Sequence, residues 1–387
     1  MNKKIFYGKQ SINKSDIKAV LKVLNSDFIT QGPNILKFEE NLKNFVGAKH
    51  AVLTNSATSS LIIACKALDV GKKDVVWTSA NTFVSSANCA LHCGAKIDLI
   101  DIEPNTGNMC LEDLSKRLFE AKNKNKLPKV IIPVHFAGQP TDQKEIWKLS
   151  KKYGFRIIED ASHSLGASRE NQKVGNCKWS DIVVSSFHPV KTITSGEGGV
   201  NFTNNANLSK RMQALRTHGI YKNLKKDKQN WHFDQKELGY NFRITDIQSA
   251  LGISQLKRIK SFINKRKKIC LFYDRYFKKE SSVHPLELKR SNNSTYHLYV
   301  VKLSLKKRGI RNQLLKFLQQ KGIILNTHYI PIHYHSYFKN IKYMRKRLKN
   351  VENYYDKAIS LPVYPDLTLK QQKYVLRCIN LFLKDKG

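Results

Sequence analysis

The sequence of 387 residues contains no long apolar run. A membrane-spanning helix needs roughly 20 consecutive apolar residues, so none is expected here. The N-terminal residues, Met1 to Phe6, include two lysines but no apolar core behind them, and a signal peptide is therefore not expected either. We predict a cytoplasmic protein without a membrane partner.

Cysteines are few and scattered. The chain has seven, and no two of them form a Cys-x-x-Cys pair. An odd number without regular spacing does not indicate a disulfide framework, and zinc has little support. Cys89 and Cys93 are four residues apart, as neighbours on one helix face would be. Reduced thiols in the cytosol and no metal site are the expectation.

Acidic residues are scarce as well, since 30 Asp and Glu stand against 68 Lys and Arg, and the net charge is +38. Such an excess suggests an anionic partner, for example nucleic acid, a membrane surface or a phosphorylated substrate. The alternative is a compositional bias spread over the solvated surface. We favour it because the basic residues lie along the whole chain. The short basic runs at 265–268 and 345–347 are predicted to be solvated helix faces. No RNP-type aromatic motif or zinc finger accompanies them, so nucleic acid is not an expected partner.

The first two-thirds of the chain alternates between strand-like apolar runs and helical spacing. Around Leu61, for example, Ala64, Cys65 and Leu68 follow at the i+3, i+4 and i+7 positions of a helix face. Alternating units of this kind predict an α/β fold, with a mostly parallel sheet and helices on both faces. Ligands then bind beyond the carboxyl ends of the strands. The predicted strands are residues 51–53, 74–78, 97–102, 130–134, 156–158, 182–187 and 199–202.

The pattern changes near residue 250. An amphipathic stretch from Ile244 to about Lys278, with Gly252 as its one Gly or Pro, is predicted to link two domains. Because the chain is too long for one simple core, we expect a large domain at 1–252 and a smaller α/β domain at 253–387. The smaller domain is predicted to have strands at 297–303 and 323–326, helices at 311–320 and 369–383, and a loop at 331–337.

The segment from Ser185 to Gly199 reads Ser-Ser-Phe-His-Pro-Val-Lys-Thr-Ile-Thr-Ser-Gly-Glu-Gly-Gly. A strand ends in hydroxyl residues, Lys191 follows Ser186 by five positions, and a glycine-rich turn leads into the next strand. A rigid, partly desolvated loop would let the Lys191 amine act as a nucleophile near neutral pH. The alternative is an ordinary surface lysine in a turn.

A second polar segment follows the predicted strand at 156–158 and contains Glu159, Asp160 and His163. At the ligand edge of a sheet, an aspartate can pair with a protonated pyridine nitrogen, which makes that ring an electron sink. The alternatives are that Asp160 caps a helix and that His163 is a packed, hydrogen-bonded core residue.

A third segment, from Thr54 to Ser60, lies between a predicted strand and an amphipathic helix. The free N–H groups at the start of that helix, with hydroxyl groups beside them, suit a phosphate dianion. Simple N-capping of the helix by serine or threonine is the alternative.

Together these segments resemble the DegT/DnrJ/EryC1/StrS family of sugar aminotransferases, within the fold-type I enzymes that use pyridoxal 5'-phosphate. The resemblance extends over nearly the whole chain. It also includes Thr30-Gln31-Gly32-Pro33 near the start and Gly239-Tyr240-Asn241-Phe242-Arg243 further along. The resemblance depends on the order and spacing of all the segments together. No single segment would be sufficient for it.

The resemblance implies how the cofactor ring is held. Lys191 would form the Schiff base with pyridoxal 5'-phosphate and later shuttle a proton. Asp160 would pair with the pyridine nitrogen, His163 would lie near the ring hydroxyl, and Phe83 would stack on the ring face. Core packing is the alternative for Phe83.

The resemblance also implies a phosphate site, a substrate site and a homodimer with composite active sites. The phosphate would be held by Ala57, Thr58 and Ser186, and by Asn241 from the neighbouring subunit. The nucleotide sugar would contact Arg243, His328 and Tyr329. Alternatively, Asn241 is a turn residue, and His328 and Tyr329 belong to ordinary strand packing.

Within the family, the chain is most similar to the branch that serves pseudaminic acid biosynthesis. The similarity lies in residues 55–59, 186–188, 245–252, 296–299, 328–332 and 359–362. That branch transfers an amine from L-glutamate to C4 of a UDP-linked 4-keto-6-deoxy-N-acetylhexosamine, and these are the expected substrates. An enzyme of the GDP-perosamine or dTDP-amino sugar type is the alternative. All these ligands are anions, which a basic cleft attracts.

Two further interpretations are weaker. A dehydratase branch of the family has a histidine in place of the lysine, and Lys191 argues against it. A basic nucleic-acid-binding regulator with an aminotransferase-like fold would carry an added DNA-binding domain. Since the family's own N-terminal pattern begins at once, no room for such a domain is expected.

Overall fold

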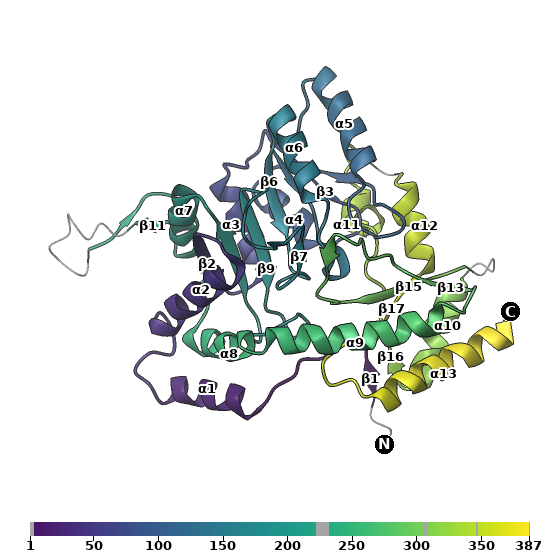
Figure 1. The fold of residues 1–387 in the computed structure, drawn as a ribbon. Coiled ribbons are helices and arrows are strands. Elements are labelled where there is room, and N and C mark those ends of the chain that lie inside the picture. Colours follow the sequence, from purple (N-terminus) through teal and green to yellow (C-terminus); the bar gives the residue numbers. More distant parts are fainter. Residues whose placement is uncertain (1–3, 222–231, 305–308, 346, 387) are drawn as a thin grey trace.

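Seven buried strands form one central sheet in the computed structural model, which describes residues 4–221, 232–304, 309–345 and 347–386 (Figure 1). Their order is β2-β10-β9-β6-β5-β3-β4. Neighbouring strands run parallel, except that β10 is antiparallel to both β2 and β9. The strands are β2 (His50–Thr54), β3 (Val75–Ser79), β4 (Lys96–Ile100), β5 (Val130–Ile132), β6 (Arg156–Asp160), β9 (Ile182–Ser186) and β10 (Gly199–Thr203). The seven strands predicted from the sequence are confirmed, since each predicted range overlaps one of these.

Alternate residues of the strands enter different cores on the two faces of the sheet. Ile182 and Val184 pack into the core that includes α3, α4 and α7, whereas Val183 between them packs with α2 and α8 on the other face. On that second face, Ile131 and Ile157 pack against α5 and α6. Strands that are buried on both faces in this way read as continuous apolar runs, which is why the sequence revealed them.

The predicted α/β class, with helices on both faces, is therefore confirmed (Figure 1). One face carries α3 (Ala57–Ala67), α4 (Ser85–His92) and α7 (Ala206–Arg216), and the other carries α2 (Pro33–Val46), α5 (Leu111–Asn123), α6 (Gln143–Tyr153) and α8 (Asp246–Leu256). Helix α1 (Lys14–Leu24) packs along α8.

The C-terminal third forms a smaller α/β unit around the antiparallel strands β13-β15-β17. Their core is shared with α9, α10 and α13, and with Ile5 of β1, because β1 pairs in parallel with β16. The elements of this unit are β1 (Ile5–Phe6), α9 (Ile259–Phe277), β13 (Val283–Pro285), β15 (Tyr299–Leu303), α10 (Ile310–Gln320), β16 (Ile323–Ile324), η2 (Ile332–Tyr334), α11 (Ser336–Lys339), α12 (Lys349–Lys357), β17 (Ala358–Leu361) and α13 (Leu369–Lys386). Two small sheets are added, β11-β12 and β14-β7-β8, with the strands β7 (Ser168–Arg169), β8 (Gln172–Lys173), β11 (Ile220–Tyr221), β12 (Asp234–Gln235) and β14 (Asn292–Asn293). A short 3-10 helix, η1 (Phe136–Gly138), follows β5.

The predicted strands and helices of this unit are confirmed, but the loop predicted at 331–337 is wrong in part. It contains the short helix η2 and the start of α11. Ile332 and Phe338 are buried there, and their packing folds the segment into helical turns that a short sequence window does not reveal. The amphipathic stretch near residue 250 forms two helices, α8 and α9, which are separated at Lys257 and Arg258. Residue 252 lies inside α8, and the domain division at 252/253 stays a prediction.

The basic run at 265–268 is not wholly a solvated helix face, as the sequence had suggested. Arg266 is 1% exposed and lies on the face of α9 that also buries Phe262, Ile269 and Tyr273. Spacings of three and four residues place these positions on one side of a helix. In the other run, Arg345 lies outside any helix and pairs with Asp113 at 2.7 Å, while Lys346 lies outside the described residues.

The buried guanidinium of Arg266 joins the two parts of the chain. It donates hydrogen bonds to the carbonyl oxygens of Val190 at 3.3 Å and Lys191 at 3.4 Å, in the loop after β9. It also donates to the carbonyl oxygens of His297 at 3.2 Å and Val363 at 2.8 Å, in the smaller unit. Burial lowers the pKa of Arg266 to about 10. Arg266 therefore fixes the loop that carries Lys191 against the smaller unit.

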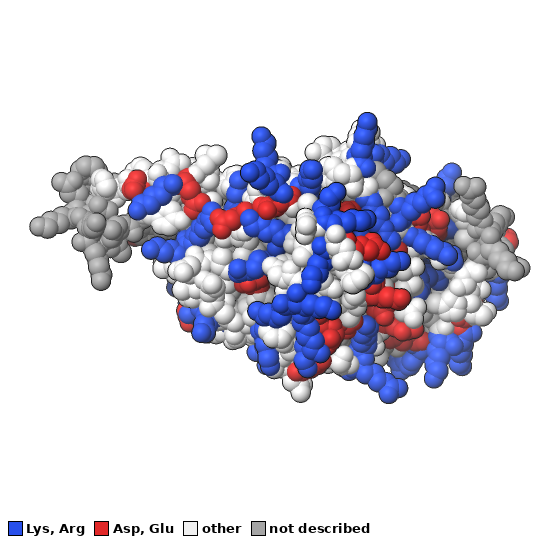
Figure 2. Space-filling view, turned by 90° about the horizontal axis from the view of Figure 1, so that it is seen from above, with Lys and Arg blue, Asp and Glu red and all other residues white. Residues whose placement is uncertain are grey.

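Positive charge is otherwise spread widely over the surface. On the coloured part of the face seen in Figure 2, Lys and Arg side chains are widely spread, and Asp and Glu lie between them. This distribution fits the compositional interpretation of the +38 charge. Within the described residues, no helix combines the length and the apolar character that crossing a membrane requires.

We expect Arg266→Met to lower the free energy of unfolding by about 2–4 kcal/mol, because the carbonyl oxygens that it serves lose their donor in a buried position. Denaturant unfolding of the two proteins measures the difference. Lys267→Met is the matched control, since Lys267 is exposed on the same turn of α9, and it should stay within about 0.5 kcal/mol of the unsubstituted chain. Equal stability of both variants would show that Arg266 is not a structural tie.

Candidate active site

A cavity of about 840 Å³ opens at the carboxyl ends of the parallel strands, where the smaller unit meets the sheet. Open α/β sheets bind their ligands at this edge. Most of the predicted site residues line this one cavity, namely Ala57, Thr58, Phe83, Asp160, His163, Ser186, Lys191, His328 and Tyr329. Asn241 and Arg243 do not line it. The structure thus brings together residues that are up to 272 positions apart, from Ala57 to Tyr329.

Lys191 lies in the loop between β9 and β10, and main-chain hydrogen bonds fix this loop. The N–H of Lys191 donates to the carbonyl oxygen of His188 at 2.9 Å. The N–H of Phe187 donates to the carbonyl oxygen of Gly198 at 2.9 Å. Gly196, at φ +84°, supplies the left-handed turn that leads back into β10. The loop is therefore held in a defined conformation, and the alternative of an ordinary surface lysine in a turn is wrong.

The environment of the Lys191 amine favours its reactive form. The residue is partly buried at the wall of the cavity, and this burial lowers the pKa of Lys191 to about 8. The carboxylates of Asp160 and Glu197 oppose the shift but do not cancel it. An amine with this pKa loses its proton far more readily at neutral pH than an exposed lysine does, as a nucleophile requires.

Asp160 ends β6 with its carboxylate at the cavity. Its Oδ2 accepts a hydrogen bond from the Ser86 hydroxyl at 2.6 Å, and its Oδ1 accepts one from the N–H of Ser162 at 3.1 Å. The second bond stabilises the turn at 162–166, and since no helix begins there, the helix-cap alternative for Asp160 is wrong. Ser86 was missed by the sequence analysis, because a serine inside α4 has no motif of its own.

The neighbouring Glu159 points to the opposite face of the sheet, as successive residues of a strand must. It is bound there by His135 at 2.7 Å and Arg169 at 3.1 Å. Burial alone would raise the pKa of Glu159, but these two partners lower it to about 2. Of the two adjacent carboxylates, strand geometry thus assigns Asp160 to the cavity and Glu159 to the scaffold.

The start of α3 forms a second wall of the cavity. The Ser56 hydroxyl accepts a hydrogen bond from the N–H of Ser59 at 3.1 Å, so the predicted N-capping is present. The first N–H groups of a helix have no partner within it and carry partial positive charge. Gly199 allows β10 to approach this turn, since a Cβ there would lie 2.5 Å from the Ser56 carbonyl oxygen and 2.6 Å from the Ala57 nitrogen. Capping and anion binding are compatible here.

The remaining predicted residues form the aromatic side of the cavity. Phe83 is 57% exposed, so the core-packing alternative for it is wrong. Its ring centre lies 6.2 Å from that of Tyr329. The Tyr329 hydroxyl is hydrogen-bonded to Nε2 of His163 at 3.0 Å, and Nδ1 of His328 is bonded to the Ser360 hydroxyl at 2.8 Å.

Several cavity residues were not assigned a role from the sequence. They are Tyr7, His188, Glu197, His297 and Asn326. His188 and Glu197 belong to the Lys191 segment, so their neighbourhood was visible in the sequence. Tyr7 follows β1, which reaches the cavity only because it pairs with β16, and no local motif could have revealed it.

The donor set fits pyridoxal 5'-phosphate. An amine of lowered pKa can bond an aldehyde carbon, a carboxylate at a strand end can pair with a pyridinium, and a helix N-terminus beside the Ser186 hydroxyl can hold a phosphate. One further feature supports the fit: Nδ1 of His163 is buried and has no hydrogen-bond partner within the described residues.

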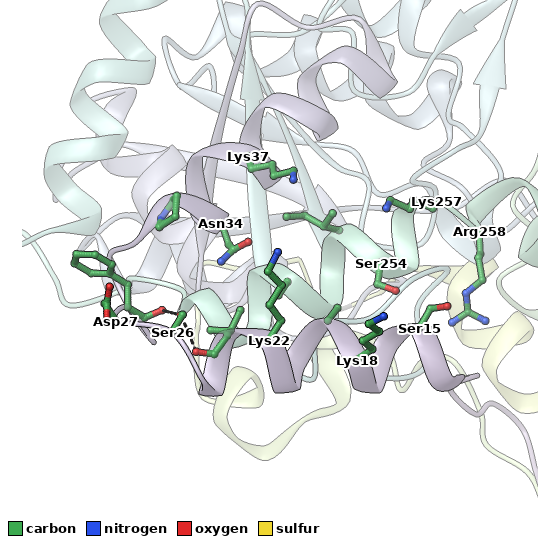
Figure 3. A pocket seen from close by; sticks show the side chains of 16 residues that line it. Ser15, Lys18, Lys22, Ser26, Asp27, Asn34, Lys37, Ser254, Lys257 and Arg258 are labelled. Carbon is green, nitrogen blue, oxygen red and sulfur yellow. Dashed lines mark hydrogen bonds between the residues drawn. The ribbon is translucent and has the colours of Figure 1, made fainter.

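A second hollow, of about 820 Å³, lies between α1, α2 and α8 (Figure 3). Lys18, Lys22, Lys37 and Lys257 surround it, over a floor that includes Val23 and Ile253. It contains none of the predicted catalytic, cofactor-binding or substrate-binding residues. The chemistry belongs to the first cavity.

The chain is similar to known proteins over nearly its whole length. The sequence profile of the DegT/DnrJ/EryC1/StrS aminotransferase family matches residues 10–380. A relative from Campylobacter jejuni, named UDP-4-amino-4,6-dideoxy-N-acetyl-beta-L-altrosamine transaminase, is 38% identical over 371 residues, which are 96% of this chain and 95% of the relative. The structure of Helicobacter pylori PseC, an aminotransferase involved in the biosynthesis of pseudoaminic acid, has a TM-score of 0.92 at 34% identity, over 99% of this chain and 100% of that one. The PLP form of Spr1654 from Streptococcus pneumoniae has a TM-score of 0.89 at 28% identity, over 98% and 99% of the two chains.

The lowered pKa of Lys191 predicts its reactivity. In protein freed of cofactor, we expect Lys191 to react with a small amine-directed reagent at a rate that rises with pH and is half-maximal near pH 8, because only the uncharged amine attacks. Peptide mass spectrometry over a pH series measures this. Exposed lysines of the same sample are the internal control, since an ordinary lysine has a pKa of about 10.4. A Lys191 peptide that titrates together with the exposed ones would contradict the burial argument.

Proposed function

The chain belongs to the DegT/DnrJ/EryC1/StrS aminotransferase family, and from this premise we propose that it transfers an amino group from L-glutamate to C4 of a UDP-linked 4-keto-6-deoxy-N-acetylhexosamine. The chain is a sugar aminotransferase. The observation that carries the proposal is the Lys191 amine, buried at the sheet edge close enough to Asp160 for the two charges to interact. The UDP-linked substrate and its place in a pseudaminic acid pathway are supported by the names of the Campylobacter and Helicobacter relatives.

We propose pyridoxal 5'-phosphate as the cofactor. When bound, it supplies an electron sink for the negative charge that develops at the reacting carbon. Asp160 would keep the pyridine nitrogen protonated, and the hydrogen bonds from Ser86 and Ser162 hold its carboxylate in place for that role. The N-terminus of α3, at Ala57 and Thr58, and the hydroxyl of Ser186 would bind the phosphate. Phe83 would cover one face of the ring.

Lys191 then serves as the acid and base of the reaction. Its amine would hold the cofactor, and when free it would take up a proton from the substrate side and give it back. A pKa of about 8 suits this work, since such an amine both gives and takes a proton near neutral pH. The hydrogen bonds from Arg266 to the carbonyl oxygens of Val190 and Lys191 hold the loop, and with it the amine, at the cavity.

Arg243, His328 and Tyr329 remain the proposed contacts of the nucleotide sugar. His328 is 5% exposed, and burial lowers its pKa to about 3, so it would meet the substrate as a neutral ring. Arg243 is a cation suited to a diphosphate, and since it does not line the cavity of its own chain, we propose that it acts across a subunit contact.

We propose that the enzyme is a homodimer with composite active sites. Asn241 is exposed, and the carbonyl oxygen of the next residue, Phe242, accepts a hydrogen bond from the N–H of Asn55 at 2.9 Å, beside the α3 turn. The segment thus lies near its own phosphate site and is open to a partner.

Exposed apolar side chains gather along α1 and the residues that follow it. Thr30 forms an isolated β-bridge with Thr245. The residues that follow α1 therefore lie close to the segment that contains Asn241. Large apolar side chains are exposed along α1 and after it, namely Ile17, Leu21, Leu24, Phe28, Ile29 and Leu36. The first three recur at helical spacing on one face, and a grouped apolar surface of this kind marks a contact with another protein. A second copy of the chain would cover it.

We propose a cytoplasmic location. The seven cysteines are free thiols in the structure, which supports a reducing compartment.

The substrate proposal predicts a clear order of turnover. With L-glutamate as donor, kcat/KM should be highest for the UDP-linked 4-keto sugar in a panel that also offers GDP- and dTDP-linked ones, and 2-oxoglutarate should form in equal amount to the amino sugar. Lys191→Ala should remain folded and lose at least about a hundredfold in kcat, because both covalent and proton-transfer roles disappear. Preference for a GDP or dTDP sugar would move the enzyme to the GDP-perosamine or dTDP-amino sugar type.

The composite site predicts complementation between two impaired chains. Lys191→Ala and Asn241→Ala should each impair both sites of their own homodimer, and exchange of subunits should restore one site that has both residues intact. Loss of one charge-assisted phosphate contact costs about 1.5–3 kcal/mol, or roughly ten- to hundredfold in cofactor affinity, so the assay needs cofactor near the dissociation constant of the Asn241→Ala protein. Activity of the mixture that never exceeds the mean of its parents would refute the composite site, as would a fully active monomer in light scattering.

A further inference from the structure

The hollow of about 820 Å³ between α1, α2 and α8 shares no lining residue with the active-site cavity. We propose that this hollow is a binding site for a nucleoside diphosphate. The phosphates would contact the lysines of its rim, and the base would lie on its apolar floor. The inference does not depend on the proposed function.

The hollow exists because α1 and α2 both pack on α8 and leave a space between them. Gly252 lets α8 approach α2, since a Cβ at this position would collide with the ring of Phe38. Asp246 of α8 then fixes the start of α2, because its carboxylate accepts hydrogen bonds from the N–H groups of Gly32 at 2.7 Å and Asn34 at 2.8 Å. The α2 wall is thus held in place.

The α1 wall is held by a buried carboxylate. Asp16 accepts a hydrogen bond from the side chain of Gln255 at 2.8 Å and pairs with Arg258, so the charge of Arg258 is already neutralised. The amide of Gln255 also donates to the carbonyl oxygen of Ser11 at 2.9 Å. These contacts fix α1 without filling the hollow. Since the hollow is preformed, a ligand need not order its walls on binding.

Four exposed lysines from three helices converge on this space. They are Lys18 and Lys22 of α1, Lys37 of α2 and Lys257 at the end of α8, and Figure 3 shows Lys22 pointing from α1 into the space below Lys37. Within the described ranges, none of the four has an ion-pair or hydrogen-bond partner. Among the described residues that line the hollow, Asp27 is the only carboxylate. The excess of positive charge matches an anion that carries several charges.

A lysine-rich composition does not by itself account for this arrangement. On α2, Lys43 pairs with Glu40 at 2.7 Å, whereas Lys37, on the side of the hollow, has no such partner in the described part of the chain. Lys18 and Lys22 are four residues apart, and like charges at this spacing destabilise a helix. The cluster therefore opposes folding slightly, and a bound anion would remove the repulsion.

The floor of the hollow is apolar, and Val23 and Ile253 are buried there. A flat ring can lie on such a floor while the phosphates reach the rim. The volume lies in the range of roughly 300–1,000 Å³ that is typical of small-molecule sites. Hydroxyl and amide side chains that can hydrogen-bond a ribose also line the hollow, namely Ser15, Asn34 and Ser254 (Figure 3).

The hollow is distinct from the apolar surface proposed above as the dimer contact. Lys22 and Ser26 lie on the side of α1 that lines the hollow. Ile17 and Leu21 recur at the same spacing on another side of the helix and do not line it. Phe28, at one end, is the residue that both surfaces share. A second copy on the apolar side would leave the hollow open except at that end.

The test is a lysine-by-lysine protection experiment on the full chain as purified, with ADP as the probe. Saturating ADP should slow the reaction of Lys22 and Lys37 with an amine-directed reagent by at least about threefold, because an ammonium group beside a phosphate keeps its proton. Lys14 and Lys43, which lie on the same two helices outside the hollow, should react at unchanged rates. Peptide mass spectrometry measures each lysine separately, so ADP in the active-site cavity would not disturb the result.

A pair of double variants tests the lysines themselves. Lys22→Gln with Lys37→Gln should raise the ADP concentration that half-protects Lys18 by about five- to thirtyfold, as expected for the loss of two exposed charge pairs. Lys14→Gln with Lys43→Gln is the matched control, since it removes the same charge from the same two helices. Its half-protecting concentration should stay within about twofold of that of the unsubstituted chain.

Two further probes test the floor. Pyrophosphate has the charges but no ring, and it should need at least about a tenfold higher concentration than ADP, because nothing covers the apolar floor. Adenosine has the ring but no phosphate, and it should not protect the lysines.

Three results would overturn the inference: no selective protection of Lys22 and Lys37 by ADP, equal affinities of the two double variants, or equal protection by pyrophosphate and ADP. None of them would affect the proposed function, which requires no ligand in the hollow.

Discussion

Burial lowers the pKa of Lys191 to about 8, although two carboxylates oppose the change. The loop that carries this amine is held in place by two sets of hydrogen bonds. The loop is closed by its own main-chain bonds, and Arg266 ties its carbonyl oxygens to the smaller unit. A flexible loop would let water reach the amine and restore the basicity of an ordinary lysine. The reactivity of the site thus depends on how the two parts of the chain are held together.

The sheet provides the second constraint. Parallel strands deliver their carboxyl ends to one edge, so Asp160 and Ser186 meet there although 26 positions separate them in the sequence. Alternation along β6 then sends Glu159 into a buried cluster with His135 and Arg169, and leaves Asp160 to the cavity. One carboxylate stabilises the scaffold while its neighbour faces the ligand. The same edge receives the N-terminus of α3, where an anion is favoured.

Much of this arrangement could be predicted from the sequence. The seven strands were visible because buried parallel strands are continuous apolar runs, and most of the site residues were visible because they occur in segments with a fixed order and spacing. Charge was a poorer guide. Arg266 stands in a run of lysines and was assigned to the surface, and only its spacing from Phe262 and Ile269 shows that it faces inward. Composition cannot distinguish a buried guanidinium from a solvated one.

Other parts depend on tertiary contacts that no local pattern encodes. Tyr7 enters the cavity through the pairing of β1 with β16, and Ser86 reaches Asp160 across 74 positions. The bond between Tyr329 and His163 joins residues 166 positions apart. The sequence named both residues, but as separate contacts of sugar and cofactor. Their hydrogen bond follows from the fold.

The most direct measurement of the central claim is a chemical one. Borohydride reduction of the protein purified with pyridoxal 5'-phosphate makes the bond between lysine and cofactor permanent, and peptide mapping then identifies the lysine. The account predicts one labelled peptide, the one that contains Lys191, and no label in the Lys191→Ala protein. A label on any other lysine, or a protein that retains no cofactor after reduction, would contradict it.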